Sequence, residues 1–159
     1  VGYPDGNVKP EGNITRAEFA TITARFFEAT YDGENLFPDI EGHWAQDYIN
    51  EAANAGIVNG YEDGTFRPDN TITYQEMVTV LSSVAAWCLL EGDELRDTEL
   101  SANDWAIYYD WADWAQIPAR NLVGLGVSLD VDAYGAQGTR DEAAGLLCQL
   151  MKSLHLLWD

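Results

Sequence analysis

A loop that leads into a helix start occurs twice in this chain, and it constrains the fold more than any other sequence feature. Residues 60–76 run from a glycine-containing turn into a Thr-x-x-Glu pattern. The same residue types recur at the same spacing over residues 2–18. One unit of a repeat rarely buries its own apolar face, so neighbouring units share a core. We therefore expect the units of this chain to pack together.

Three Thr-x-x-Glu patterns each predict the start of a helix. In such a capping box the threonine hydroxyl accepts from the third helical N–H, and the glutamate accepts from the threonine N–H. Apolar residues follow each box at helical spacing, which predicts three amphipathic helices. The boxes are Thr15-Arg16-Ala17-Glu18, Thr73-Tyr74-Gln75-Glu76 and Thr139-Arg140-Asp141-Glu142.

Shorter helices are expected around these three. Residues 43–53 read as one, and Gly56 follows it as a C-terminal cap. A tryptophan-rich and tyrosine-rich run at residues 104–116 predicts another, which Pro118 should stop. The pattern therefore predicts an all-α fold in which shorter helices and loops surround a central three-helix bundle.

Composition excludes several classes of partner. The chain has 159 residues, 47 % of them hydrophobic, which is enough for one compact core. It carries 27 acidic and 8 basic residues, a formal charge of −19, whereas nucleic-acid binding needs clustered lysine and arginine. The longest apolar run, residues 84–90, is far shorter than the roughly 18 residues of a membrane span. We expect neither a nucleic-acid partner nor membrane insertion.

The patterns of common catalytic and metal sites do not occur in the sequence. His43 and His155 are far apart, and there is no His-Glu-x-x-His and no Cys-x-x-Cys. We therefore expect no enzyme activity, no metal and no cofactor. Cys88 and Cys148 both lie within apolar helical patterns, which leaves two interpretations, buried free thiols or one disulfide.

One part of the chain resembles a known family along nearly a full repeat. The matching residues are Phe37-x-Asp39-x-x-x-His43-Trp44-Ala45, Ala53-x-x-Gly56-Ile57, Gly60-Tyr61-x-Asp63-Gly64-Thr65-Phe66-x-Pro68 and Ile72-Thr73-x-x-Glu76. They resemble the repeat of the S-layer homology (SLH) family. By this resemblance the chain is a single SLH-type domain, 1–159. Residues 1–31 form the second half of a first unit, 32–91 a second unit, and 92–159 a degenerate third unit.

The resemblance implies a pseudo-threefold helical domain with an anchoring function. Members of the family attach extracellular bacterial proteins noncovalently to secondary cell-wall polysaccharide, often a pyruvylated polymer, in grooves between repeats. We therefore expect a location at the cell surface, in the cell wall. The third unit departs most from the pattern, since Trp105-Ala106 matches Trp44-Ala45 only if three inserted residues are allowed.

Arg16 and Arg140 are the first candidates for binding an acidic sugar. Each occupies the first helical position inside a capping box, where the side chain is expected to point outward and where N–H groups favour an anion. A guanidinium group can bind a carboxylate through two parallel hydrogen bonds. The alternative for each is a salt bridge. Tyr74 stands where the family has arginine, so the third pocket should lack this group.

The turn residues and two tryptophans complete the candidate ligand-binding set. Glycine permits a positive φ, and aspartate in a turn commonly accepts from the backbone two residues on, so a structural role is the alternative. Tyrosine could cover a sugar face, and each tryptophan either lines a groove or packs an outer helix. The candidates are Tyr3, Asp5, Gly6, Trp44, Tyr61, Asp63, Gly64 and Trp105.

The sequence leaves a second functional hypothesis open. The first unit lacks its first half, and a missing outer helix would expose part of the Phe19, Ile22 and Phe26 stripe. Exposed apolar surface of this kind tends to recruit a partner, here a second copy of the chain. The chain is then either a wall anchor or a degenerate module that acts in protein–protein assembly without glycan binding.

Overall fold

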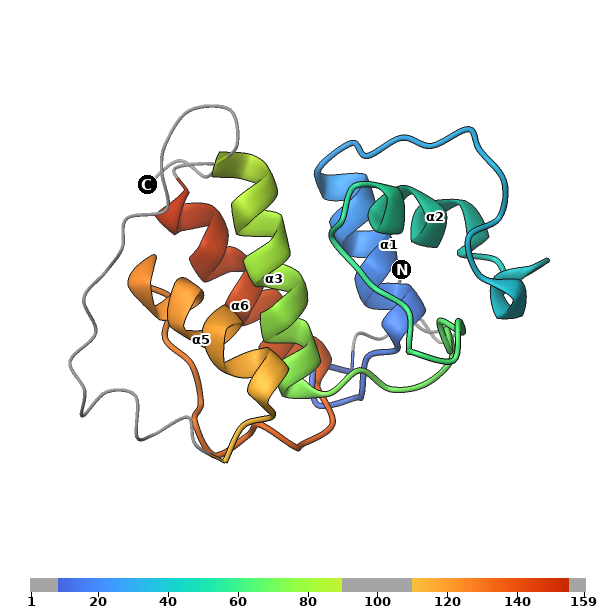
Figure 1. Cartoon of the computed structure of the whole chain (residues 1–159). Coiled ribbons are helices and arrows are strands. Elements are labelled where there is room, and N and C mark those ends of the chain that lie inside the picture. The colour runs from blue at the N-terminus through green and yellow to red at the C-terminus, as the bar shows by residue number, and fades with distance from the viewer. Residues whose placement is uncertain (1–8, 90–109, 155–159) are drawn as a thin grey trace.

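The computed structural model of the chain describes residues 9–89 and 110–154 (Figure 1). Over these residues the regular structure is helical, and β structure is limited to isolated bridges. The predicted all-α fold is therefore confirmed. The helices are α1 (Arg16–Phe26), the short 3-10 helix η1 (Pro38–Ile40), α2 (Gln46–Asn54), α3 (Tyr74–Leu89), α5 (Asp113–Gly124) and α6 (Arg140–Ser153).

Helices α1, α3 and α6 begin at the three capping boxes. The Thr15 hydroxyl accepts from the Glu18 N–H at 3.1 Å, and a Glu18 carboxylate oxygen accepts from the Thr15 N–H at 3.0 Å. The same exchange occurs at the starts of α3 and α6. The predicted helix starts are therefore confirmed. They could be predicted from sequence because a capping box involves only two side chains and the backbone beside them.

Just before these helices, three backbone segments close a ring of hydrogen bonds. The Ile14 N–H donates to the Gly138 carbonyl at 3.0 Å, and the Gly138 N–H donates to the Ile72 carbonyl at 2.8 Å. The Ile72 N–H completes the ring by donating to the Ile14 carbonyl at 3.0 Å. This backbone ring places the starts of α1, α3 and α6 in a pseudo-threefold arrangement.

The first two N–H groups of each capped helix also donate to another part of the chain. Arg16 and Ala17 donate to the carbonyls of Asn70 and Pro68, each at 2.9 Å. At the starts of α3 and α6 the equivalent donor and acceptor pairs are Tyr74–Ala136, Gln75–Tyr134, Arg140–Gly12 and Asp141–Pro10. Loop carbonyls and the cap threonine therefore satisfy the first N–H groups that a helix start leaves unpaired.

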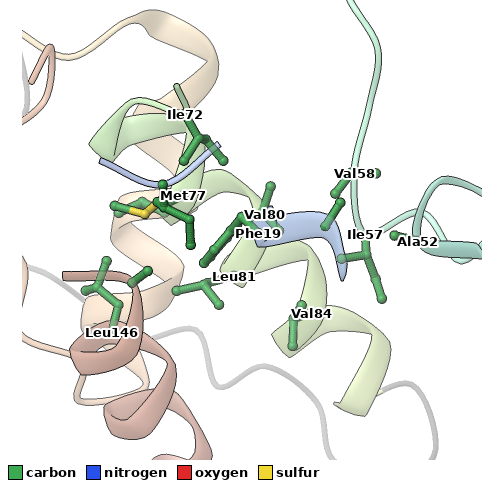
Figure 2. Close-up of a cluster of buried hydrophobic side chains, with 14 of the residues drawn as sticks. Phe19, Ala52, Ile57, Val58, Ile72, Met77, Val80, Leu81, Val84 and Leu146 are labelled. Atoms are coloured by element: carbon green, nitrogen blue, oxygen red, sulfur yellow. The ribbon is translucent and has the colours of Figure 1, made fainter. Parts of the chain in front are cut away.

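The core lies around α3. Helix α2 packs on α1, whereas α5 and α6 pack on α3 (Figure 1). Phe19 of α1 points toward Leu81 of α3, and Leu146 of α6 lies on the other side of the same cluster (Figure 2). Farther along α1, Ile22 is 40 % exposed and Phe26 is 41 % exposed. Exposure was expected for part of the stripe of Phe19, Ile22 and Phe26, and the structure exposes the last two, whereas Phe19 is 1 % exposed.

Helices α2 and α5 end in the same way. The Gly56 φ is +71°, and the Ile57 N–H donates to the Ala52 carbonyl at 2.9 Å, as in a Schellman motif. At the end of α5 the Gly126 φ is +87°, and the Val127 N–H donates to the Leu122 carbonyl at 3.0 Å. Counting back from these caps pairs Trp44-Ala45-Gln46 with Trp114-Ala115-Gln116.

Within the described part of the helix expected at residues 104–116, residues 113–116 are helical and 110–112 are not, and the expected stop at Pro118 is wrong. Helix α5 begins at Asp113, and Pro118 lies inside it. Residues 104–109 lie outside the described residues. The helix continues through the proline because one of its faces, made of small and aliphatic side chains, is fully buried against α3. The stabilisation from this burial outweighs the loss of one backbone hydrogen bond. The buried face consists of Ala115, Ala119 and Leu122.

Both cysteines are free, which agrees with one of the two interpretations, but only Cys88 is partly buried. Burial raises the pKa of the Cys88 thiol. Cys148 is exposed, contrary to expectation, because it lies on the outer side of α6. None of the helices in the described part is both long and apolar enough to span a bilayer. Over the same residues, no three His, Cys, Asp or Glu side chains gather as a metal site would need.

Candidate functional site

A groove of about 850 Å³ lies between α1, α3 and the loop that joins α2 to α3. Its volume falls in the range of ligand pockets, roughly 300–1,000 Å³. The groove brings together Arg16 of the first unit, the candidates Tyr61 and Asp63 of the second, and Trp114 of the third. Arg67 also lines it.

Arg16 is held by the second unit rather than directed freely into solvent. Its side chain is only 8 % exposed. The Nε atom donates to the Phe66 carbonyl at 2.8 Å, and Nη2 donates to the Asn59 carbonyl at 2.9 Å. Nη1 forms an ion pair with a Glu76 oxygen at 3.1 Å. The expectation of an outward-pointing arginine on a helix start with free N–H groups is therefore wrong, because both the side chain and the backbone donors meet acceptors of the next unit.

Glu76 links this ion pair to the start of α3. One of its oxygens accepts from the Thr73 N–H at 2.8 Å and completes the capping box. The other accepts from Arg16 and, at 2.9 Å, from the Tyr61 hydroxyl. Burial raises the pKa of Tyr61; the Arg16 guanidinium opposes this rise, and the hydrogen bond to Glu76 adds to it. The phenol therefore stays protonated and donates to the carboxylate.

Asp63 and Gly64 shape the turn of this loop. One Asp63 oxygen accepts from the Thr65 N–H at 3.0 Å and from its hydroxyl at 2.6 Å, and the other pairs with Arg67 at 2.8 Å. These bonds, that of the Thr65 hydroxyl foremost, hold the pKa of Asp63 well below its ordinary value. Gly64 has a φ of +81°, which favours glycine. Both residues fill the turn roles named as the alternative to ligand binding.

Arg67 is a groove residue that sequence reasoning missed. Its backbone φ is +57°, unusual for a residue with a side chain, and Asp39 holds this conformation by accepting from the Arg67 N–H at 2.7 Å. The guanidinium carbons of Arg67 and Arg16 lie 4.2 and 4.6 Å from the centroid of the Tyr61 ring. The side chain of Arg67 is 45 % exposed. The sequence feature that could have identified Arg67 is the presence of an arginine within the loop that resembles the SLH repeat.

Trp114 is the second residue that was missed. It lines the groove and is 53 % exposed, whereas the predicted Trp44 is 61 % exposed and does not line this groove. Trp105 lies outside the described residues. The signal that identifies Trp114 is an identical Trp-Ala-Gln triplet in the second and third units. The alignment that allowed three inserted residues paired Trp44 with Trp105 instead of Trp114.

Arg140 repeats the relation that Arg16 has with Glu76. Its Nη2 atom forms an ion pair with a Glu18 oxygen, so a first-position arginine again meets the capping-box glutamate of another unit. The expected outward orientation is wrong here too, for the same reason. The repeat would bring Tyr3, Asp5 and Gly6 to this place, but they lie outside the described residues.

Tyr74 takes the place of arginine at the start of α3. It is only 3 % exposed, and its hydroxyl accepts from the Asp130 N–H at 3.0 Å. Its ring meets that of Trp111 edge to face, with centroids 6.1 Å apart. An aromatic contact therefore stands where the other two units have an ion pair.

The family model described as the S-layer homology domain matches residues 1–20 and 36–78. These residues belong to the S-layer homology family. The predicted SLH membership is confirmed. A cellulosome-anchoring protein of Acetivibrio thermocellus is 42 % identical over 118 residues, which cover 70 % of this chain and 26 % of the relative. Cell surface glycoprotein 1 of the same organism is 38 % identical over 117 residues, 66 % of this chain and 5 % of the relative.

The SLH relatives are much longer than this chain and differ in kind. An amylopullulanase of Thermoanaerobacterium thermosulfurigenes is 30 % identical over 95 % of this chain, yet the match covers only 8 % of the relative. The S-layer protein of Bacillus thuringiensis subsp. finitimus is 29 % identical over 84 % of this chain and 16 % of the relative. The matched region is therefore a small part of proteins that have different names.

Proposed function

We propose that this SLH domain is a noncovalent anchor that holds a bacterial surface protein to the cell wall, outside the cell. The names of the relatives support it, because they include a cellulosome-anchoring protein and S-layer proteins. The observation that carries the proposal is the groove at Arg16, where three units contribute to one ligand-sized space. On this proposal residues 1–159 act as one domain without enzyme activity.

The ligand proposed for this groove is secondary cell-wall polysaccharide that carries a carboxylate, such as a pyruvate ketal. A guanidinium group has five N–H bonds, and Arg16 uses three of them in the hydrogen bonds described above. On this proposal the other two donate to the ligand carboxylate. The Arg67 guanidinium, nearly half exposed beside Tyr61, adds positive charge at the same place. Local cations can hold an anionic polymer on an acidic protein because salt screens its distant charges.

The three helix starts differ in whether they offer a cation to an acidic sugar. Arg140 is proposed as a second site, because it has the same ion pair as Arg16. Tyr74 is buried and offers no cation, so the third position is not proposed to bind an acidic sugar. We expect one or two working grooves.

Co-sedimentation with purified Gram-positive cell walls tests the anchor. Binding should disappear when the secondary polymer is stripped from the peptidoglycan. Arg16→Ala should weaken binding to intact walls at least tenfold, and Arg140→Ala should weaken it less. Arg25→Ala is a matched control, because Arg25 is an exposed arginine on α1 that does not line the groove. Undiminished binding to stripped walls would contradict the proposal.

Because Arg16 also connects α1 to the second unit, its variants need a check of folding. Arg16→Lys keeps the charge but loses the paired donors, so we expect it to bind poorly while its thermal unfolding remains cooperative. A folded Arg16→Lys protein that binds intact walls as the wild type does would show that the paired donors are not needed.

The alternative function, protein–protein assembly, rests on the exposed side chains of Ile22 and Phe26. If this surface pairs two copies, sedimentation equilibrium should give the mass of a dimer at micromolar concentration. The double change Ile22→Ser and Phe26→Ser should then return the protein to the monomer mass. A wild-type monomer over the whole concentration range would rule self-association out.

A further inference from the structure

One side of α6 is exposed where the equivalent sides of α1 and α3 are buried. The fifth and ninth residues after the cap threonine are buried in α1 and α3 but exposed in α6. These residues are Ala20 and Ala24 in α1, Val78 and Ser82 in α3, and Ala144 and Cys148 in α6. A Cβ atom added at the neighbouring Gly145 would meet no atom within 4 Å. We call Ala144, Gly145 and Cys148 the open face of α6.

In α1 and α3 an outer helix covers the equivalent face. Helix α2 packs on α1, and α5 packs on α3 (Figure 1). The cover of α3 reaches the ninth position itself, because the Ser82 hydroxyl accepts from the Asn121 side-chain amide of α5 at 3.3 Å. Within the described residues, α3 is the only helix that packs extensively on α6. The open face therefore has the position of a helix-covered face, but none of the described helices covers it.

The path of the chain indicates where a helix over α6 would come from. After α2, the Pro68 carbonyl accepts from an N–H at the start of α1, and after α5 the Tyr134 carbonyl does the same at the start of α3. At the start of α6 the equivalent acceptor is Pro10. Pro68 lies 14 residues after the end of α2 at Asn54, and Tyr134 lies 10 residues after the end of α5 at Gly124. By the same spacing, a helix over α6 would end just ahead of the first residue.

We propose that the open face of α6 is the docking site for one further helix, carried by the polypeptide that precedes Val1. This helix is amphipathic and of the same kind as α2 and α5, with small and aliphatic side chains on its docked face. In α2 such a face is formed by the fully buried Ile49 and Ala52, and in α5 by the fully buried Ala115. Small side chains on both helices allow a short distance between their axes, and docking removes apolar surface from water.

An extended protein tests this docking site. A copy of residues 32–58 is fused directly ahead of Val1, which keeps the register of the repeat because Val1 aligns with Asn59. Cys88→Ser in every protein leaves Cys148 as the only thiol, and its rate of reaction with a disulfide reagent measures access to the open face. The extension should slow this reaction at least about tenfold and raise the midpoint of thermal unfolding by about 5 °C or more.

Two controls separate docking from a general effect of added chain. The first carries Ile49→Asp and Ala52→Asp in the added copy only, which puts charges on the docked face, so Cys148 should react as fast as in the original chain. The second is Ala144→Arg. It should leave the original chain as stable as before, because residue 144 is exposed, but it should cancel the gain in stability of the extended protein.

Circular dichroism checks that the extended protein folds. If it does not, a synthetic peptide of residues 32–58 at millimolar concentration repeats the thiol test on the original chain and should slow the reaction. An unchanged rate at Cys148, in the folded extension or with the peptide, would overturn the proposal, and so would equal protection by the extension that carries the two aspartates. If Cys148 of the original chain becomes protected as its concentration rises, with the mass of a dimer by sedimentation, a second copy covers the face, and the assignment to the preceding segment is overturned.

Discussion

Glu76 is the residue on which the groove and the helix framework meet. One carboxylate oxygen caps α3 at Thr73, and the other binds both Arg16 and the Tyr61 hydroxyl. Hydrogen bonds to a charged acceptor contribute more than neutral ones, about 1.5–3 kcal/mol each when they are buried. The start of α3, the first unit and the groove are thus coupled through a single side chain.

The Asp63 carboxylate should remain ionised at acid pH. Its pKa lies below the ordinary value because the Thr65 hydroxyl, the Arg67 guanidinium and the Thr65 N–H all donate to it. A lowered pKa means that its contribution to loop order is present above the ordinary pKa and is lost only as pH falls through the lowered one. At about pH 3, somewhat below the ordinary value, the side-chain carboxyl carbon should still give the chemical shift of a carboxylate by NMR.

Thr65→Val supplies the control for this measurement. The change removes the hydroxyl that contributes most to the lowered pKa but keeps the backbone donor, so the Asp63 titration should move toward the ordinary value. A wild-type titration at the ordinary value would show that these donors do not stabilise the charged form.

For individual residues, the sequence identified Arg16 as a candidate but did not predict its hydrogen-bond partners. Two of its acceptors are the carbonyls of Phe66 and Asn59, and a backbone carbonyl has no signature in the residue type that bears it. Glu76 was recognised as a cap, but its second oxygen was not considered. The pairing of Arg16 with Glu76 depends on how two units dock, which no local pattern of residues encodes.

Among the elements, α5 departs most from local rules. Pro118 lacks the N–H that would donate to the Trp114 carbonyl, and proline inside a helix costs about 3 kcal/mol relative to alanine. Pro118→Ala should therefore raise the free energy of unfolding by about 1–3 kcal/mol, less than the full cost because proline also restricts the unfolded chain. Urea denaturation, with the midpoint compared at constant slope, measures the change.

The comparison for Pro118→Ala is Ile117→Ala, since Ile117 is the neighbouring residue of α5 and its side chain is 63 % exposed. This neighbouring change removes exposed side-chain atoms and should alter stability by less than about 0.5 kcal/mol. A drop in stability for Pro118→Ala would show that the half-buried proline ring contributes packing that exceeds the restored hydrogen bond.

The sequence predicts some elements better than others for a physical reason. The starts of α1, α3 and α6 follow from four consecutive residues each, so local chemistry decides them. The extent of α5 is decided by burial against α3, and that burial is a property of the assembled core. A rule that proline ends a helix therefore failed at Pro118, although it is sound for an isolated segment.

For the whole molecule, the backbone ring leaves no room for a side chain at Gly138. A Cβ atom there would lie 2.5 Å from the Met77 methyl carbon and 3.0 Å from the Ile72 carbonyl oxygen. Gly138→Ala should lower the free energy of unfolding by about 1–3 kcal/mol, since the methionine can move but the carbonyl belongs to the ring. Thermal or urea unfolding measures the loss.

Gly135→Ala tests whether this loss is specific to the ring. A Cβ at Gly135 would meet no atom within 4 Å, so this change should be neutral or slightly stabilising. Equal losses at both glycines would attribute the effect to chain flexibility instead. The pseudo-threefold plan itself was expected only from the family resemblance, since contacts between backbone segments so far apart in the chain leave no mark on composition or periodicity.

Because the ring at Ile14, Ile72 and Gly138 is made of main-chain hydrogen bonds, it needs no particular side-chain chemistry beyond the glycine at position 138. Tyr74 can therefore stand where the other two capped helices begin with arginine, while α3 keeps its place at the ring. The cation at one helix start can thus be lost without loss of the main-chain framework that holds the other two.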